Sequence, residues 1–168
     1  TIKNLGVKDV QMSGVASAYS NNRAGMAAFM NGTTIKDSYV ENINLVDATN
    51  TANSAFVTSD AGFVCFSGNG ASVINNCYVK DAHVEGGDAG CFGGFMDNMT
   101  INNCYVSGTS TVKSNYDNTN NKYYAGCFCG GGTSSGYINN CYSLATVASG
   151  STVNRIAAFT TIKNTVTN

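Results

Sequence analysis

Apolar and polar positions alternate along the chain in short runs, with a period of two. Nowhere do apolar residues recur at i, i+3, i+4 and i+7 over the length of a helix. Stretches rich in Val, Ile, Tyr and Thr are instead separated by Asn, Gly and Ser, which is typical of short strands joined by turns. The pattern therefore predicts an all-β chain.

One phrase, Ile-x-Asn-Cys-Tyr-Val, recurs with variations along the whole sequence. Its successive Ile positions are separated by 33, 39, 27, 37 and 24 residues, beginning at Ile2, Ile35, Ile74, Ile101, Ile138 and Ile162. A second phrase, Ala-Gly-x-Phe in its clearest form, alternates with the first and occupies residues 24–29, 61–66, 89–94, 125–130 and 156–159. The strands keep their identity, while the connections between them vary in length.

A unit of two or three short strands cannot bury its apolar face alone, but stacked units share one continuous core. We therefore predict that residues 1–168 form a single domain, a right-handed parallel β-helix (β-solenoid) of about five to six coils. A β-propeller needs four strands in roughly 40 residues, more than the repeats of 24 and 27 residues provide. The chain begins without Met and stops inside a repeat, so we expect it to be a segment of a longer protein.

The Asn that precedes each Cys is predicted to form a corner between two strands. Ile74 has the strand parity of Tyr78 rather than that of Cys77, so Ile and Cys point inward together only if the alternation breaks between them. Asn tolerates the left-handed backbone that such a break requires. We expect these side chains to form an amide ladder along the rod, at Asn76, Asn103 and Asn140. The simpler alternative is that Asn is common in turns.

The seven Cys residues are interpreted as buried thiols, because they share columns with apolar residues. Cys77, Cys104 and Cys141 align with Leu5, and Cys91 and Cys127 align with Met26 and Phe63. A disulfide between stacked coils is the alternative. His83 is the only histidine and no zinc-like Cys spacing occurs, so we predict no metal site and no cofactor.

Charge is sparse and balanced. Charged residues make up 11% of the chain, the formal net charge is −1, and no run of like charge occurs. Nucleic acid and anionic membranes require a positive surface, so we exclude both as partners. No window of 18 apolar residues is present, so we also expect no membrane insertion.

Candidate binding residues come from two places. Outward-facing tyrosines recur once per coil and include Tyr78 and Tyr105, whose rings we expect to stack. Long insertions follow the Val strand at residues 17–23, 47–60 and 113–124, and the last of these carries the most aromatic and amide side chains. The predicted binding residues are Tyr116, Asp117, Tyr123, Tyr124, Tyr78 and Tyr105. Purely structural stacking and a solvated loop are the respective alternatives.

Catalysis is not favoured by the distribution of ionisable residues. Glycan-cleaving enzymes need clustered carboxylates, but the ten acidic residues are scattered. The one dense group is Lys80, Asp81, His83 and Glu85, in which Asp81 and His83 share strand parity. Ser107 and Gly108 fill the equivalent positions of the next copy. We predict no catalytic residues, and a glycan-cleaving β-helix enzyme remains an alternative.

The pattern Gly-x-Ile-x-Asn-Cys-Tyr, followed by a Val strand and by Ala-Gly-x-Phe-Gly-Gly, resembles the GLUG repeat of bacterial cell-surface proteins. The likeness is strongest over residues 61–148, and it departs where Ser38, Thr165 and Leu5-Gly6 replace Cys or Cys-Tyr. Such repeats occur in secreted and wall-attached proteins, including non-catalytic parts of immunoglobulin-A-cleaving metallopeptidases. The resemblance implies a secreted or cell-surface adhesin or stalk with no catalytic residues. Its partner would be a host or cell-surface glycan or protein. The alternative is a protomer that binds copies of itself, stacked end to end into a fibre, because Ile2 and Ile162 open repeats without a polar cap.

Overall fold

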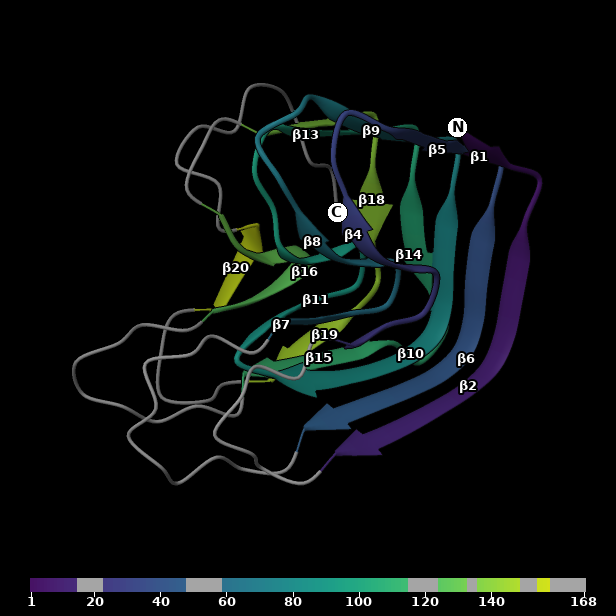
Figure 1. Ribbon diagram of the computed structural model, residues 1–168. Coiled ribbons are helices and arrows are strands. Elements are labelled where there is room, and N and C mark those ends of the chain that lie inside the picture. The colour runs from purple at the N-terminus through teal and green to yellow at the C-terminus, as the bar shows by residue number, and fades with distance from the viewer. Residues whose placement is uncertain (15–22, 48–58, 115–123, 133–135, 149–153, 158–168) are drawn as a thin grey trace.

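The computed structural model describes residues 1–14, 23–47, 59–114, 124–132, 136–148 and 154–157, and every regular element in them is a β-strand (Figure 1). All strand pairs are parallel and are grouped in three sheets. Seen along the rod, the sheets form three walls around a shared core (Figure 1). The prediction of an all-β parallel solenoid is confirmed.

Each coil contributes strands to the three sheets in turn. Sheet A has the order β1 (Ile2–Lys3), β5 (Thr34–Lys36), β9 (Ser72–Asn75), β13 (Met99–Asn102), β17 (Tyr137–Asn139). Sheet B contains β2 (Gly6–Gly14), β6 (Tyr39–Asp47), β10 (Tyr78–Gly86), β14 (Tyr105–Ser107), β15 (Thr111–Ser114), β18 (Tyr142–Ser143) and β19 (Thr146–Ala148). Sheet C contains β3 (Arg23–Ala24), β4 (Ala27–Met30), β7 (Ser59–Ala61), β8 (Val64–Ser67), β11 (Asp88–Gly90), β12 (Gly93–Phe95), β16 (Ala125–Gly131) and β20 (Asn154–Ala157).

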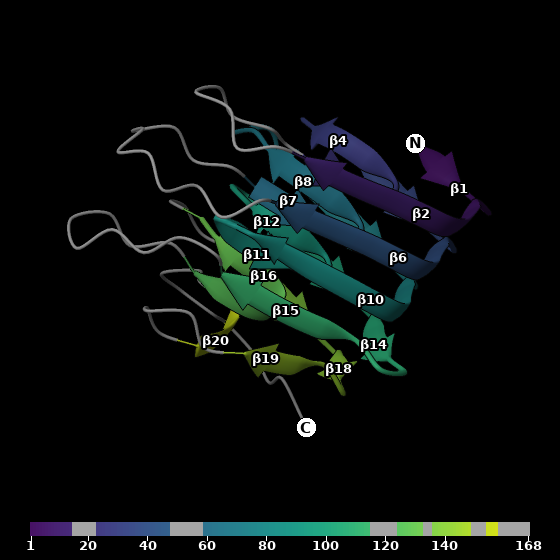
Figure 2. The same cartoon turned by 90° about the horizontal axis from the view of Figure 1, so that it is seen from below.

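Equivalent residues of successive copies lie beside one another. In sheet A the repeated Ile residues pair in one row, through Ile2, Ile35, Ile74, Ile101 and Ile138. Figure 2 shows β2, β6 and β10 side by side in chain order in sheet B. Five coils are thus stacked in sheet A, and the copy that begins at Ile162 lies outside the described residues.

The corner between sheets A and B is built on a left-handed residue, as predicted. Asn76, Asn103 and Asn140 have φ values of 54°, 51° and 51°, and Asn4 and Asp37 occupy the same place in the first two coils with 55° and 50°. Asn and Asp tolerate this conformation better than most residues. The break in alternation turns Ile, Cys and Val of one copy inward together, and Ile74, Cys77 and Val79 are all buried.

A second left-handed corner bends sheet B itself, and it was not predicted. Asp9, Asn42 and Asp81 have φ values of 58°, 51° and 51°, and Gly108 takes the place in the fourth coil with 69°. The bend falls in the middle of β2, β6 and β10 (Figure 1). A Cβ on Gly108 would collide with the Asp81 carboxylate, which Thr109 N holds in place by a hydrogen bond, so glycine suits this position in the fourth coil.

The core is a set of buried columns that run along the rod. Phe63, Phe92 and Phe128 are fully buried, and their ring centroids are 5.3 Å and 5.6 Å apart. The predicted alignment of the second phrase was wrong by one residue, because Cys91 and Cys127 lie in the column of Gly62, while Phe63 aligns with Phe92. Stacking the large rings on one another fills the core better than stacking sulfur on a ring.

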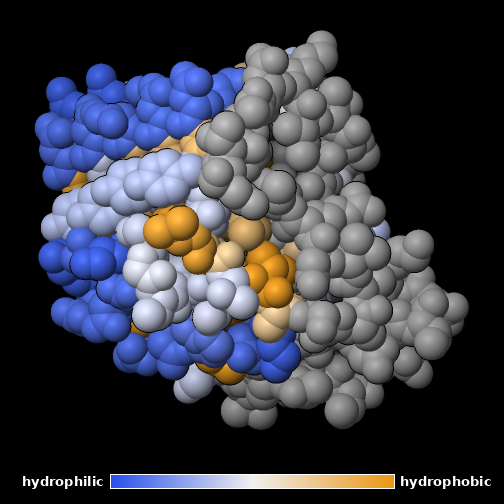
Figure 3. Space-filling view, turned by 180° about the vertical axis from the view of Figure 1, so that it is seen from behind, coloured by the Kyte–Doolittle hydropathy of each residue, from blue (hydrophilic) through white to orange (hydrophobic). Residues whose placement is uncertain are grey.

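The first coil leaves parts of these columns exposed. In it Ile2, Leu5 and Met12 continue inward-facing rows but are each about 40% exposed. Leu144, in the fifth coil, is 65% exposed because it follows the inward-facing Ser143 in an outward-facing row. Seen from behind, apolar side chains gather near the middle of the face, with polar side chains around them (Figure 3). In the part of the chain that is described, no helix is long and apolar enough to span a membrane.

Candidate functional site: the tyrosine groove

The outward tyrosines form a continuous stack along sheet B. Tyr39, Tyr78, Tyr105 and Tyr142 lie in one row, with ring centroids 5.0, 5.1 and 5.3 Å apart and interplanar angles of 5°, 10° and 5°. The stacking predicted from the sequence is confirmed. Both faces of the Tyr78 and Tyr105 rings are covered by neighbouring rings, so these two tyrosines present their edges to a partner.

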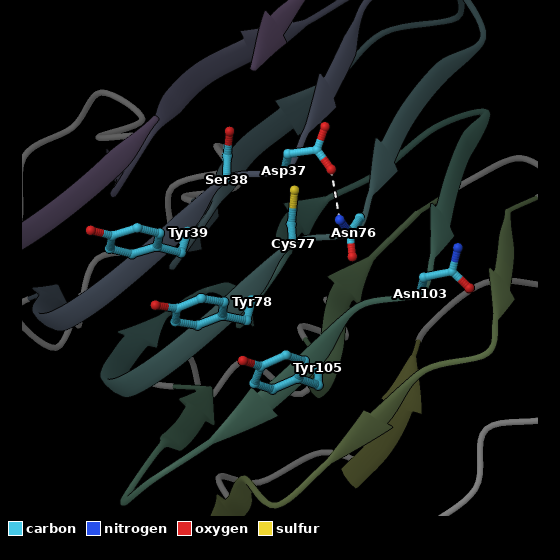
Figure 4. A pocket seen from close by; sticks show the side chains of 8 residues that line it. All are labelled: Asp37, Ser38, Tyr39, Asn76, Cys77, Tyr78, Asn103 and Tyr105. Atoms are coloured by element: carbon cyan, nitrogen blue, oxygen red, sulfur yellow. Dashed lines mark hydrogen bonds between the residues drawn. The ribbon is translucent and has the colours of Figure 1, made fainter. Parts of the chain in front are cut away.

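A groove runs beside this stack across three successive coils, with a volume of about 320 Å³. In Figure 4 the tyrosine rings lie on one side of the groove and Asp37, Asn76 and Asn103 on the other. Ser38 and Cys77 lie between the two rows, and both are buried. We call this feature, lined by residues 37–39, 76–78, 103 and 105, the tyrosine groove.

The polar wall is held in place by side-chain hydrogen bonds between coils. Asn76 Nδ2 donates to Asp37 Oδ1 at 2.6 Å, and Asn140 Nδ2 donates to Asn103 Oδ1 at 3.3 Å. The predicted ladder is only partly confirmed, because Asn103 Nδ2 donates to Oδ1 of Asn75 rather than to Asn76, at 3.2 Å. An amide has two N–H donors and an oxygen with two lone pairs, so one such rung leaves each amide with further hydrogen-bonding capacity.

The floor of the groove uses sulfur and hydroxyl atoms as acceptors. The backbone N–H of Cys77 donates to Cys104 Sγ at 3.4 Å, and that of Cys104 donates to Cys141 Sγ at 3.3 Å. In the first coils the same bond runs from Leu5 N to Ser38 Oγ at 3.1 Å. The strand direction changes at the left-handed residue, so these N–H groups have no carbonyl opposite them, and the side chain of the next coil accepts the bond instead.

The thiols are buried and form no disulfides. All seven Cys residues lie in the described ranges in the thiol form, and all except Cys127 are buried. Burial raises the pKa of Cys91, Cys104 and Cys129 above the ordinary thiol value, so these groups are neutral at pH 7. The prediction of buried Cys is confirmed for this part of the chain, with the hydrogen bonds of Cys77 and Cys104 as an added role that composition did not indicate.

A charged network borders the groove on its tyrosine side. Glu41 accepts hydrogen bonds from Lys8 Nζ at 2.7 Å and from Tyr78 OH at 2.6 Å, and these two bonds hold the pKa of Glu41 below its usual value. Burial and the bond to Glu41 raise the pKa of Tyr78, which therefore remains a neutral phenol. Lys8 Nζ also lies 5.3 Å from the centroid of the Tyr39 ring. Lys8 and Glu41 occupy the same position in successive coils, so opposite charges are adjacent along this column.

The dense ionisable group of Lys80, Asp81, His83 and Glu85 does not form a single cluster, because Asp81 and His83 bond to different partners. Asp81 Oδ1 accepts from Thr109 N at 2.9 Å. His83 Nε2 contacts Glu85 Oε1 at 3.0 Å, and His83 Nδ1 lies 2.6 Å from Thr111 Oγ1. The second corner at Asp81 explains this division, because the alternation that would have placed Asp81 and His83 on one face is broken there. Within the described residues no group of three or more His, Cys, Asp or Glu side chains could hold a metal ion.

The predicted binding residues of the longest insertion are only partly described. Tyr116, Asp117 and Tyr123 lie outside the described residues, so their placement stays a prediction. Tyr124 is half-buried, and its backbone N–H donates to Asp88 Oδ1 at 3.1 Å. Tyr78 and Tyr105 both line the groove.

Sequence reasoning missed the polar wall and one buried acid. The three corner Asn residues were assigned to the turn and the amide ladder but not to a binding surface, and Asp37 was not singled out. An Asx two residues before an outward Tyr, in the second to fifth copies, was a usable signal. Asp88 is only 4% exposed, and burial raises its pKa to about 7. Its carboxylate packs against Gly131, where a Cβ would lie 2.7 Å from Asp88 Oδ2.

No family model, no curated protein and no solved structure matches the chain. The evidence about its function is therefore the fold and the chemistry of the described surface. The GLUG resemblance stays a prediction that rests on the repeated motif.

Proposed function

We propose that the chain is a non-catalytic, extracellular repeat module of a bacterial surface protein, an adhesin or stalk that presents the tyrosine groove to a partner. The single observation that carries this proposal is the groove itself, an outward-facing cavity of about 320 Å³ built from the same residues in successive coils. A rigid stack of parallel strands holds those side chains at fixed spacing, which lowers the entropic cost of binding.

The chemistry of the groove supports binding rather than bond cleavage. General acid–base cleavage of a glycan needs two carboxyl groups placed on either side of the scissile bond. Asp37 is the one acidic residue that lines the groove, and it accepts a hydrogen bond from Asn76. Amide and phenol groups instead provide donors and acceptors for a polar partner.

The test measures whether the chain binds to a surface and whether it cleaves a glycan. The purified chain is applied to a glycan array, to a peptide array and to whole bacterial and host cells, and polysaccharide supernatants are assayed for new reducing ends. We expect retention on at least one of these surfaces and no release of reducing ends. Release of reducing ends would overturn the non-catalytic role, and failure to be retained on any surface would overturn the binding role.

A second candidate is a protomer that stacks end to end into an extracellular fibre. The exposed Ile2, Leu5 and Met12 favour it, because they extend inward-facing rows of the core to the first coil. Sedimentation velocity over a wide concentration range distinguishes the two candidates. A species that remains monomeric at the highest concentration would remove the fibre.

A further inference from the structure

The groove repeats its chemistry once per coil. Each of the three coils that line it contributes a left-handed Asx, and the paired tyrosine rings recur at centroid spacings of 5.0 Å and 5.1 Å. Tyr142 continues the row at 5.3 Å in the next coil, beside Asn140. A partner that lies along the rod thus meets the same set of groups at each step, and a polymer with a matching repeat length would use every set.

Repeat length separates the classes of polymer. An extended polypeptide advances roughly 3.3 Å per residue, so its side chains lose register with the coils within one or two steps. In an extended chain of β-1,4-linked pyranoses, each sugar residue adds the length of one ring and its bridging oxygen. This length is comparable to the spacing between successive tyrosine rings. Its residues therefore remain in register with successive coils over the whole groove.

Charge excludes another class. A nucleic acid or a polyanionic glycan needs several cations along its path, but the groove is lined by one carboxylate, Asp37, and by neutral side chains. Lys8 Nζ lies 5.3 Å from the centroid of the Tyr39 ring, and Glu41 neutralises this cation at 2.7 Å. An uncharged chain fits these surroundings best.

The orientation of the tyrosines selects the mode of contact. The faces of Tyr78 and Tyr105 are covered by neighbouring rings, so C–H groups of a sugar cannot stack on them. Ring edges carry partial positive charge and suit hydroxyl oxygens. On the opposite wall, the second N–H of each amide and its oxygen can bond the hydroxyls on the other edge of the sugar.

We propose that the tyrosine groove binds an unbranched, uncharged glycan with equatorial 1,4-linkages, laid parallel to the rod with one sugar residue per coil. This inference rests on the proposed function, because it names the ligand class of the same site. Asn76 and Asn103 bond the hydroxyls on one edge of the chain, and Tyr78 and Tyr105 contact the other edge.

Calorimetric titration with cello-oligosaccharides, from the disaccharide to the hexasaccharide, tests the inference directly. The affinity is expected to rise with each added sugar until the chain spans the coils that line the groove, and then to level off. Malto-oligosaccharides of the same length curl away from a straight groove and should bind at least roughly tenfold more weakly. Equal affinity for the two series, or an affinity that does not depend on length, would overturn the inference.

Two matched pairs of variants locate the site. Asn103→Gly removes an amide of the polar wall while keeping the left-handed backbone, and it should weaken binding on the order of threefold to tenfold. Asn98→Gly makes the same change at a positive φ of 46°, outside the residues that line the groove, and should leave the affinity unchanged. Tyr105→Leu and Tyr137→Leu form a second pair, of which only the first removes a ring edge from the groove and should weaken binding.

The outcomes separate the inference from the proposed function. If cello-oligosaccharides fail to bind, but a sulfated glycan or a peptide from the arrays binds and Asn103→Gly weakens it, the ligand class is wrong and the binding role stands. If no probe binds in a way that responds to Asn103→Gly or Tyr105→Leu, the groove is not a binding site and both proposals fail. Unfolding midpoints of each variant are measured alongside to confirm that the fold is intact.

Discussion

The backbone N–H of Cys77 donates to the sulfur of Cys104 one coil away, at 3.4 Å. The same sulfur lies 3.0 Å from the carbonyl oxygen of Asn102, which accepts its proton. The thiol therefore satisfies a backbone donor and a backbone acceptor at the corner where the regular ladder is interrupted. Ser38 does both with its hydroxyl, at 3.1 Å from Leu5 N and 2.8 Å from Lys36 O.

Replacing Cys104 tests this role. Cys104→Ala leaves the buried N–H of Cys77 without its acceptor and should lower the free energy of unfolding by about 1–3 kcal/mol. Cys104→Ser restores an acceptor of the kind that Ser38 already provides, and it should cost less. The measurement is urea unfolding of both variants. Cys91 is the control, because its buried thiol lies between two strands of sheet C, away from that corner, and Ser there should be no better than Ala.

The left-handed corner predicts the order of stability of two variants of Asn103. Asn103 has a φ of 51°, which Asn tolerates because its short polar side chain can hydrogen-bond locally. Asn103→Ala loses this compensation and should cost about 1–2 kcal/mol, whereas Asn103→Gly has no Cβ and avoids that cost. We expect the Gly variant to be the more stable of the two in thermal unfolding. This would be unusual for a residue between two strands, where Gly generally destabilises. At Thr100 in β13 the ordinary ranking should hold, so Thr100→Ala should be more stable than Thr100→Gly.

The buried carboxyl of Asp88 predicts a dependence of stability on pH. Burial raises its pKa from 3.8 to about 7, so the folded state holds a proton that the unfolded state has already released. The associated stability is fully present below about pH 4 and is lost as the pH rises to about 7, with a loss of at most about 4 kcal/mol. Asp88→Asn should remove this slope and be more stable than the parent at about pH 8.

Asp81→Asn is the matched control for the pH experiment. Asp81 is partly exposed and sits at a left-handed corner that Asn also tolerates, and its oxygen accepts from Thr109 N. The Asp81→Asn variant should retain the pH slope of the parent. If Asp88→Asn retains the slope as well, another group is responsible for it.

The phenylalanine column predicts an unequal pair of truncations. Phe92 is fully buried between Phe63 and Phe128, so Phe92→Ala should cost about 3–5 kcal/mol. Phe29 is 57% exposed, so Phe29→Ala should cost less than about 1 kcal/mol. Similar losses for the two variants in guanidinium unfolding would contradict the observed register of sheet C.

The sequence predicted the columns of sheets A and B but misplaced one in sheet C. The Ile and Tyr rows followed directly from the repeated phrase, because the constant phrase and its alternation leave one register in which Ile74 meets Ile101 and Tyr78 meets Tyr105. In sheet C the phrase Ala-Gly-x-Phe is compatible with two registers, one residue apart. Packing decided between them, since the one observed stacks Phe63 on Phe92.

The candidate site was predictable in part for a similar reason. The tyrosine stack follows from a strand with an outward aromatic residue in every copy. The groove beside it depends on where the chain turns, and the Asx side chains form its second wall only because the left-handed corner directs them outward. Asp81 and His83 face different partners because the second corner lies between them. That corner could not be read from the sequence, because it is recognised only from the backbone angles of Asp9, Asn42 and Asp81.

The amino-acid sequence by itself determined the repeat, the parallel solenoid and the inward or outward side of the main columns, because a two-residue period and a constant phrase allow few ways to bury apolar faces. Tertiary structure alone decided the register of sheet C, the bend within sheet B, the hydrogen bonds of the thiols and the burial of Asp88. Each of these depends on which atoms of the neighbouring coil come within contact distance, and that is set by the stacking of whole coils rather than by any local pattern.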